Sequence, residues 1–349
     1  MKTPGAADSR VSPTSGNQPR HKAGRWLRWL LGLAALGALI LACRHFSDAR
    51  DFVLLAKQAE PWWLVLAVAF QAGTYLAQAQ VYRSVVHAGK SPLPLKPAYQ
   101  MSLIKLFVDQ ALPSAGLSGT AVFAQGLERL GIPRRIVATA VAVAIATGNA
   151  VDLLCLVVAM VIAAARGEIS SLLLVLSLTF ALFVLVLIGL IYGGHSHALP
   201  RWLARIGPLR RVHEFVQAAD TALARNPGLL ARAALWELCL VLLDAATVWV
   251  LIRALGTHAS PSGVFASFVL SALVNAMAFM LPGGLGAFEG ASVVTLRFAG
   301  VPVAVALSAT LLFRGLSFWL PMLPGFWFSR RFMKSPKDQA TEAIQRGHS

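Results

Sequence analysis

The chain has 349 residues, of which 57% are hydrophobic and 13% are charged, and its formal net charge is +16. Soluble globular domains carry about 25% charged residues, so this composition excludes an ordinary soluble fold. The positive residues lie mainly at the ends of apolar runs, which is how membrane topology is set, so we expect no nucleic acid partner. We predict an all-α polytopic membrane protein whose backbone polar groups are paired within helices.

Polar tails flank the apolar part of the chain. Residues 1–24 are rich in Pro, Gly and Ser, which predicts a disordered cytoplasmic tail, and 334–349 are predicted to form a second one. Between them, 25–333 form the transmembrane domain, in which a full span needs about 20 apolar residues. Six runs are predicted to be full spans: Trp26–Cys43, Trp62–Arg83, Ile136–Ala165, Ser171–Gly193, Leu229–Arg253 and Val303–Phe328.

Two further apolar segments, 97–131 and 262–300, are interrupted by the sequences LPSAGLSG at 112–119 and LPGGLGAFEG at 281–290. Proline and glycine break a helix inside the membrane and release backbone groups, which is tolerated only within protein or beside water. We predict two re-entrant helix–turn–helix hairpins, although two full crossings would place the loops on the same sides. The residues of the broken-helix turns are Pro113, Gly116, Gly119, Pro282, Gly283, Gly284 and Gly286.

The two broken segments resemble one another. They align without gaps at an offset of 169 residues, with six identities in 29 positions. Each hairpin follows one span and precedes another, which defines repeat A at 62–165 and repeat B at 229–328. The connecting segment 171–225 contains a span and a basic stretch predicted to lie at the inner membrane surface. Because the hairpins are expected to start from opposite sides, we predict an inverted repeat, the architecture of many transporters.

The distribution of basic residues predicts the orientation. With both termini in the cytoplasm, 22 Lys and Arg residues fall on the inner side and six on the outer side. Basic residues are concentrated in cytoplasmic loops of membrane proteins. We therefore expect a multi-pass protein of the bacterial inner membrane.

Ionisable side chains inside the apolar segments are the candidate site residues, because buried charges in membranes are costly and often functional. Glu289 follows the second turn, and Arg314 lies within the last span. We expect these two to form either a structural ion pair or a site for a lipid phosphate. Lys105 and Asp109 are four residues apart, so they can pair on one helix face, either as a structural bridge or in contact with substrate.

The central spans hold further polar residues. Asn149 and Asp152 indicate a polar seam in one span, and Asn275 is a similar residue in the second hairpin. Glu237 and Asp244 are seven residues apart and share a helix face. There they either line a proton or cation path or pair with arginines of neighbouring segments.

Repeat B carries the residues by which the chain resembles a known family. The LPGGLGAFEG turn, the Gly-Val-Pro after the half-helix, and Arg314 followed by Trp319, Pro321 and Gly325 are similar to the lysylphosphatidylglycerol synthase transmembrane region, the flippase-like UPF0104 family. The resemblance covers 50–330 and implies a stand-alone member, with the hopanoid-associated membrane proteins as a matching subgroup. It also implies that Glu289 and Arg314 belong to a lipid site.

Repeat A departs from the family pattern. Where the family has Gly-Glu and Arg after the turn and Glu-Arg in the next span, this chain reads GLSGTAVFAQ and ATGNAVD and keeps only Asp152. The soluble synthase domain is expected to be absent, so aminoacyl transfer is not implied. The three cysteines form no CxxC pair, and no metal-ligand spacing or nucleophile motif is present, so we expect no enzyme activity, metal site or cofactor.

Together, the residues and the resemblance predict a lipid flippase that translocates a polar-headed lipid between leaflets. The alternative is a non-transporting accessory or scaffold subunit of a lipid-modifying or envelope-biogenesis system. The expected partners are membrane lipids with anionic or polar headgroups, and a membrane-protein partner or a homo-oligomer is left open. The candidate headgroup residues are Glu289, Arg314, Lys105, Asp109, Asp152 and Asn149.

Overall fold

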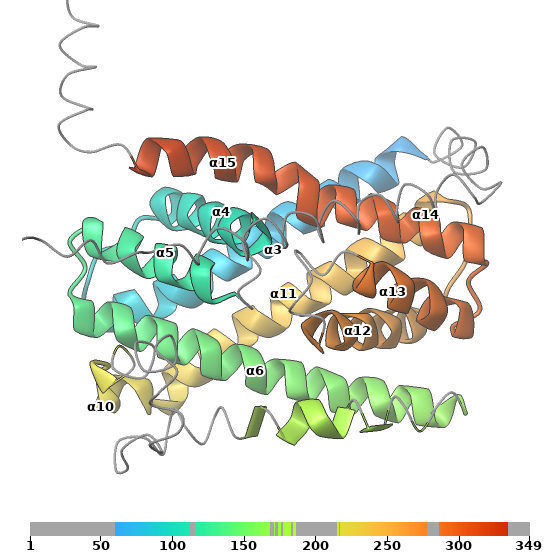
Figure 1. Cartoon of the computed structure of the whole chain (residues 1–349), viewed down its shortest axis with the longest axis horizontal. Helices are drawn as coiled ribbons and strands as arrows, with labels where there is room; N and C mark the ends of the chain where they lie inside the picture. Colours follow the sequence, from blue (N-terminus) through green and yellow to red (C-terminus); the bar gives the residue numbers. More distant parts are fainter. Residues whose placement is uncertain are drawn as a thin grey trace, which may run out of the picture.

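The computed structural model describes residues 60–111, 116–167, 217–277 and 286–333, together with isolated positions between 171 and 215. Every regular element in these ranges is helical (Figure 1). The helices are α3 (Pro61–Ala88), α4 (Leu95–Ala111), α5 (Leu117–Arg129), α6 (Arg134–Ala165), α10 (Thr221–Ala224), α11 (Pro227–Ala254), α12 (Pro261–Met277), α13 (Ala287–Phe298), α14 (Val303–Arg314), a π-helical turn (Gly315–Trp319) and α15 (Leu320–Met333).

Four helical segments of the described chain are long and apolar enough to cross a membrane. They are Pro61–Ala88, Arg134–Ala165, Pro227–Ala254 and Val303–Arg330. These segments confirm four of the predicted spans as long apolar helices. The predicted span Trp26–Cys43, both tails and most of 171–214 lie outside the described residues.

The first two helices of each predicted repeat match in length and spacing. Helices α3 and α11 each have 28 residues, α4 and α12 each have 17, and both pairs begin at a proline or leucine 166 residues apart. A hydrogen bond is also repeated at this offset: Arg83 Nε donates to the Leu93 carbonyl at 2.9 Å, and Trp249 Nε1 donates to the Ala259 carbonyl at 3.0 Å. The repeated contact shows that two different residue types close the same loop.

The second half of each repeat follows a different offset. Helix α5 ends at a Gly131-Ile132-Pro133 connector and α13 ends at Gly300-Val301-Pro302, 169 residues later, with φ values of 82° and 86° at the two glycines. Ile132 N–H donates to the Leu127 carbonyl, and Val301 N–H donates to the Leu296 carbonyl. The gapless offset of 169 therefore holds only after the broken turns, because the turn of repeat B is longer.

Helices α3 and α11 pack against each other as an antiparallel pair along most of their length (Figure 1). Near one end, the Trp63 and Trp249 rings lie 6.1 Å apart, centroid to centroid. In the middle, Gln71 is hydrogen-bonded to Asp244. Close to that point, a Cβ on Gly73 would lie 3.1 Å from the Leu243 side chain, so glycine permits the close crossing.

Each broken segment packs against the last span of the other repeat. Helix α4 of repeat A lies along α15, and α12 of repeat B lies along α6. The first of these contacts is close, because a Cβ on Gly325 would lie 2.6 Å from the Leu103 carbonyl oxygen and 2.7 Å from the Phe107 Cβ. A movement of either broken segment therefore has to be accommodated by the opposite repeat.

Candidate functional site

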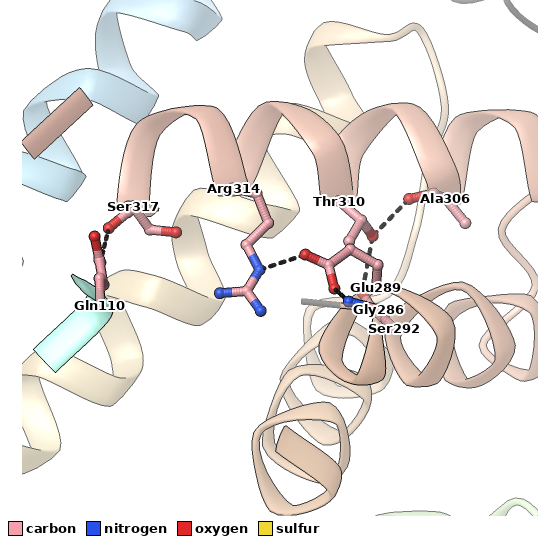
Figure 2. A network of polar contacts seen from close by, with 8 residues as sticks. All are labelled: Gln110, Gly286, Glu289, Ser292, Ala306, Thr310, Arg314 and Ser317. Atoms are coloured by element: carbon pink, nitrogen blue, oxygen red, sulfur yellow. Dashed lines mark hydrogen bonds and ion pairs between the residues drawn. The ribbon is translucent and has the colours of Figure 1, made fainter. Parts of the chain in front are cut away.

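The candidate site is centred on a buried ion pair between Glu289 and Arg314. Glu289 is the third residue of α13, and its Oε2 accepts a hydrogen bond of 2.7 Å from the backbone N–H of Gly286, the residue before the helix. Its Oε1 accepts from Arg314 Nε, also at 2.7 Å (Figure 2). The side chains are only 6% and 12% exposed. One carboxylate thus satisfies a helix N-terminus and neutralises an intramembrane arginine.

Glycine is required where α13 begins. Gly286 has φ of 89°, a value that residues with a Cβ rarely adopt. This conformation turns its N–H toward the carboxylate that follows three residues later. Pro282, Gly283 and Gly284, the other residues predicted for this turn, lie outside the described residues.

Aromatic rings cover the ion pair. The Arg314 guanidinium lies 4.6 Å from the centroid of Phe288 and 5.7 Å from that of Phe318. Phe288 in turn stacks on Phe313, with centroids 5.7 Å apart. The rings exclude water from the pair and also interact favourably with the cation. Leaving either charge unpaired here is costly, since a lone buried charge destabilises a protein by about 3–5 kcal/mol.

A π-helical turn follows Arg314 directly and connects the site to repeat A. Tyr75 OH, from α3, donates to the Leu316 carbonyl at 2.9 Å. Gln110 Nε2, from α4, donates to the Ser317 carbonyl at 3.2 Å (Figure 2). π-helical turns disturb the regular backbone hydrogen bonds and often mark functional positions. Side chains from two helices of repeat A hold this turn in the last span of repeat B.

Repeat A contains a second carboxylate at the start of a half-helix. Asp109 Oδ2 pairs with Lys105 Nζ at 2.8 Å, the i,i+4 pair predicted from the sequence. Asp109 Oδ1 accepts from the N–H of Gly119, the third residue of α5, at 2.9 Å. Any Cβ on Gly119 would lie 2.3 Å from that oxygen, so the contact requires glycine. Gly116, with φ of 79°, precedes the helix, and Pro113 lies outside the described residues.

The two pairs have the same chemistry but different connections. In both, a carboxylate accepts from the first turn of a returning half-helix and pairs with a cation. Lys105 and Asp109 belong to one helix, α4, whereas Glu289 and Arg314 come from α13 and α14. Separation of the second pair therefore requires two helices to move apart.

Asn149 and Asp152, the remaining predicted headgroup residues, lie elsewhere. Asn149 Nδ2 donates to the Ile145 carbonyl of its own helix. The Asp152 side chain is exposed and interacts electrostatically with Glu237 of α11. Across from Glu237, a Cβ on Gly148 would lie 3.6 Å from the Glu237 Oε1. These residues line the α6–α11 contact and do not contribute a hydrogen bond to the Glu289–Arg314 pair.

Sequence reasoning missed the residues that hold the π-helical turn. Tyr75 and Gln110 are polar residues within apolar helices, which is the only signal that could have pointed to them. It also left open whether Asp244 pairs with an arginine. The structure pairs Arg314 with Glu289 and places Asp244 beside Gln71.

Outside the spans, Asp220 joins the α10 segment to the start of α6. Its Oδ1 accepts from the N–H groups of Ala222 and Leu223, and its Oδ2 pairs with Arg135 at 2.8 Å. The Leu223 N–H donor, together with the Arg135 guanidinium, lowers the pKa of Asp220 below its ordinary value. The basic N-terminal end of α6 is therefore held by a carboxylate that stays ionised at neutral pH.

Comparison with known proteins identifies related sequences. Residues 29–325 match the family model described as the lysylphosphatidylglycerol synthase TM region. A UPF0104 membrane protein of Methanothermobacter thermautotrophicus (strain Delta H) is 31% identical over 109 residues, which are 31% of this chain and 32% of that protein. The chain thus spans about a third of the length of that curated relative.

Proposed function

Because the chain belongs to the lysylphosphatidylglycerol synthase transmembrane family, we propose that it is a lipid flippase that moves a polar-headed lipid between the leaflets of the bacterial inner membrane. The observation that carries the proposal is the Glu289–Arg314 pair. It is buried, covered by aromatic rings, and located at the N-terminus of a short half-helix. Such half-helix ends form the substrate sites of transporters built from inverted repeats.

The lengths of the broken segments support re-entrant hairpins. Helices α5 and α13 have 13 and 12 residues. At a rise of 1.5 Å per residue they extend over about 20 Å and 18 Å, well short of the about 30 Å hydrocarbon core. In the proposed topology both turns lie near the midplane, the two repeats have opposite orientations, and both termini are cytoplasmic. The helix N-termini then present N–H groups and positive dipole charge where a headgroup passes.

Exchange of partners at Arg314 gives a mechanism for moving a charged headgroup. An arginine stays protonated in proteins, so it needs an anion at every stage in the membrane. A lipid phosphate can replace Glu289 as the partner of Arg314, since guanidinium binds carboxylate and phosphate in the same geometry. Glu289 retains the Gly286 N–H donor while it is separated from the arginine. No buried charge is then left without a partner.

The test is lipid translocation by purified protein in liposomes. Fluorescent phosphatidylglycerol, a neutral lipid and a terpenoid lipid are compared in parallel. We expect one class to move, and we expect Glu289→Gln and Arg314→Ala to abolish the movement. Arg297→Ala is the matched control, because Arg297 is an exposed arginine at the other end of α13.

The outcomes separate the site from the function. Full translocation by both site variants would show that the pair is structural only. If the folded wild-type protein moves no lipid under any ion gradient, the flippase proposal is wrong and an accessory or scaffold role replaces it.

A further inference from the structure

A second buried carboxylate, Asp244, lies at the middle of the α3–α11 crossing. It has no role in the exchange described above. Gln71 Nε2 donates to Asp244 Oδ1 at 3.2 Å, and no described basic residue forms an ion pair with this carboxylate. A carboxylate within a membrane span is costly unless it is paired or protonated. Asp244 therefore needs an account that its one hydrogen bond does not supply.

The partner side chain has an unused acceptor. Gln71 is 3% exposed, and its Nε2 donates both to Asp244 and to Thr74 Oγ1, at 3.0 Å. The Gln71 Oε1 atom is buried and has no hydrogen-bond partner among the described residues. Nearly all buried polar atoms in native proteins are hydrogen-bonded, so an orphaned oxygen beside a carboxylate needs a reason.

An amide beside a carboxylate can serve both of its protonation states. The ionised carboxylate only accepts, and it is satisfied by the amide N–H, as in the structure. The protonated form has an O–H that donates, and it is satisfied by the amide oxygen after the side-chain amide rotates. We propose that Asp244, held by Gln71 at the α3–α11 crossing, is a proton-binding site that couples lipid movement to a proton gradient. The coupling rests on the proposed function, whereas the proton binding does not.

The other ionisable groups around α11 leave this role to Asp244. From α3, Tyr75 interacts electrostatically with it. From α6, Asp152 interacts instead with Glu237, which is seven residues and about 10 Å away along α11. Arg314, at the end of α14, is paired with Glu289. Helices α10 and α12 carry no ionisable side chains.

Oxygen ligands for a metal ion are poorly arranged at this site. The Thr74 hydroxyl accepts from Gln71 Nε2 and donates to the Gln71 carbonyl at 2.7 Å, so its oxygen is already engaged. Only the Asp244 carboxylate and the Gln71 Oε1 then remain as ligands. Hard cations take six or more oxygens. This favours a proton over a sodium ion.

The proton site is connected to the lipid site by one side chain. Tyr75 lies one helical turn after Gln71 and donates to the Leu316 carbonyl, two residues after Arg314. A change in the charge of Asp244 therefore acts on the same tyrosine that holds the π-helical turn of the last span. Proton binding and headgroup exchange share this contact.

Infrared difference spectroscopy of the full-length protein in liposomes tests the proton site directly. During a pH titration, a protonated buried carboxyl gives its own C=O band. We expect this band to be lost in Asp244→Asn. In Gln71→Leu a larger fraction of the carboxyl should be protonated at a given pH, because the anion has lost its donor. Glu237→Gln, on the same helix face, is the matched control and should leave the band in place.

A transport arm tests the coupling. A pH gradient should accelerate lipid movement by wild type, and Asp244→Asn should lose the acceleration while retaining the movement seen without a gradient. Unchanged spectra in both Asp244→Asn and Gln71→Leu would overturn the proton site, even if lipid moves. Acceleration by a sodium gradient in place of a pH gradient would also overturn it. The Asp244 band without any lipid movement would refute the flippase proposal and leave the proton site standing.

Discussion

Removal of one partner of the Glu289–Arg314 pair should cost more than removal of both. Glu289→Gln leaves Arg314, which cannot lose its proton, without its carboxylate in a site that is 12% exposed or less. The expected destabilisation is about 3–5 kcal/mol, the cost of breaking a buried pair. Arg314→Leu should cost less, because the carboxyl of Glu289 can take up a proton and become neutral. The two substitutions thus differ although they break the same contact.

The double variant Glu289→Gln/Arg314→Leu gives the sharpest test. It leaves no buried charge, and the introduced glutamine side chain can still accept from the Gly286 N–H through its amide oxygen. Replacement of a whole buried pair by neutral residues is often close to neutral in stability. We therefore expect the second substitution to restore most of the stability lost in Glu289→Gln.

Equilibrium unfolding of the four proteins in detergent, followed by circular dichroism, measures the coupling energy. The matched control is the Arg135–Asp220 pair, in which the arginine side chain is 67% exposed. An exposed pair should give a coupling of about 1 kcal/mol or less. Additive effects at Glu289 and Arg314, or a double variant less stable than either single one, would refute the buried-pair reasoning.

Three further substitutions test contacts elsewhere. Gly119→Ala should destabilise the protein by about 1–3 kcal/mol in the same unfolding assay, because its Cβ would lie 2.3 Å from the Asp109 carboxylate. Gly290→Ala is its control; with open space around the Cβ, it should be neutral or stabilising. Tyr75→Phe removes the donor to the π-helical turn and should cost about 1 kcal/mol; an unchanged unfolding curve would contradict it. The lowered pKa of Asp220 contributes stability above the ordinary aspartate pKa, about 3.9, that is lost as pH falls through the lower folded value. Asp220→Asn should flatten that acid dependence, and an identical acid profile would refute this assignment.

The sequence predicted the parts of the fold that depend on composition and on proline and glycine. The four long helices and the breaks at Gly116 and Gly286 follow from apolar length and from helix-breaking residues. The matching start of the two repeats could not be found in this way. Their equivalent loop contacts use Arg83 in one repeat and Trp249 in the other, so sequence identity is lost where the backbone is alike.

The site was predicted as far as local spacing allows. Lys105 and Asp109 pair because they lie one turn apart, and Glu289 was placed by its position after the turn. The bond from Gly119 N–H to Asp109 crosses a turn of unknown course, so no spacing rule could predict it. Nothing in the residues of 315–319 signals a π-helical turn, since its geometry depends on donors from α3 and α4.

The difference between the two carboxylate pairs indicates which repeat moves when a headgroup binds. Asp109 and Lys105 lie on the same helix, and Asp109 also holds the first turn of α5, so a change within this pair would break a hairpin apart. Glu289 and Arg314 lie on two helices and are followed by a π-helical turn, where the backbone can change its hydrogen bonds at low cost. The pair in repeat B can therefore open without unfolding either helix. Because α15 packs closely on α4 through Gly325, such an opening would displace α4 of repeat A, and both repeats would respond to one headgroup.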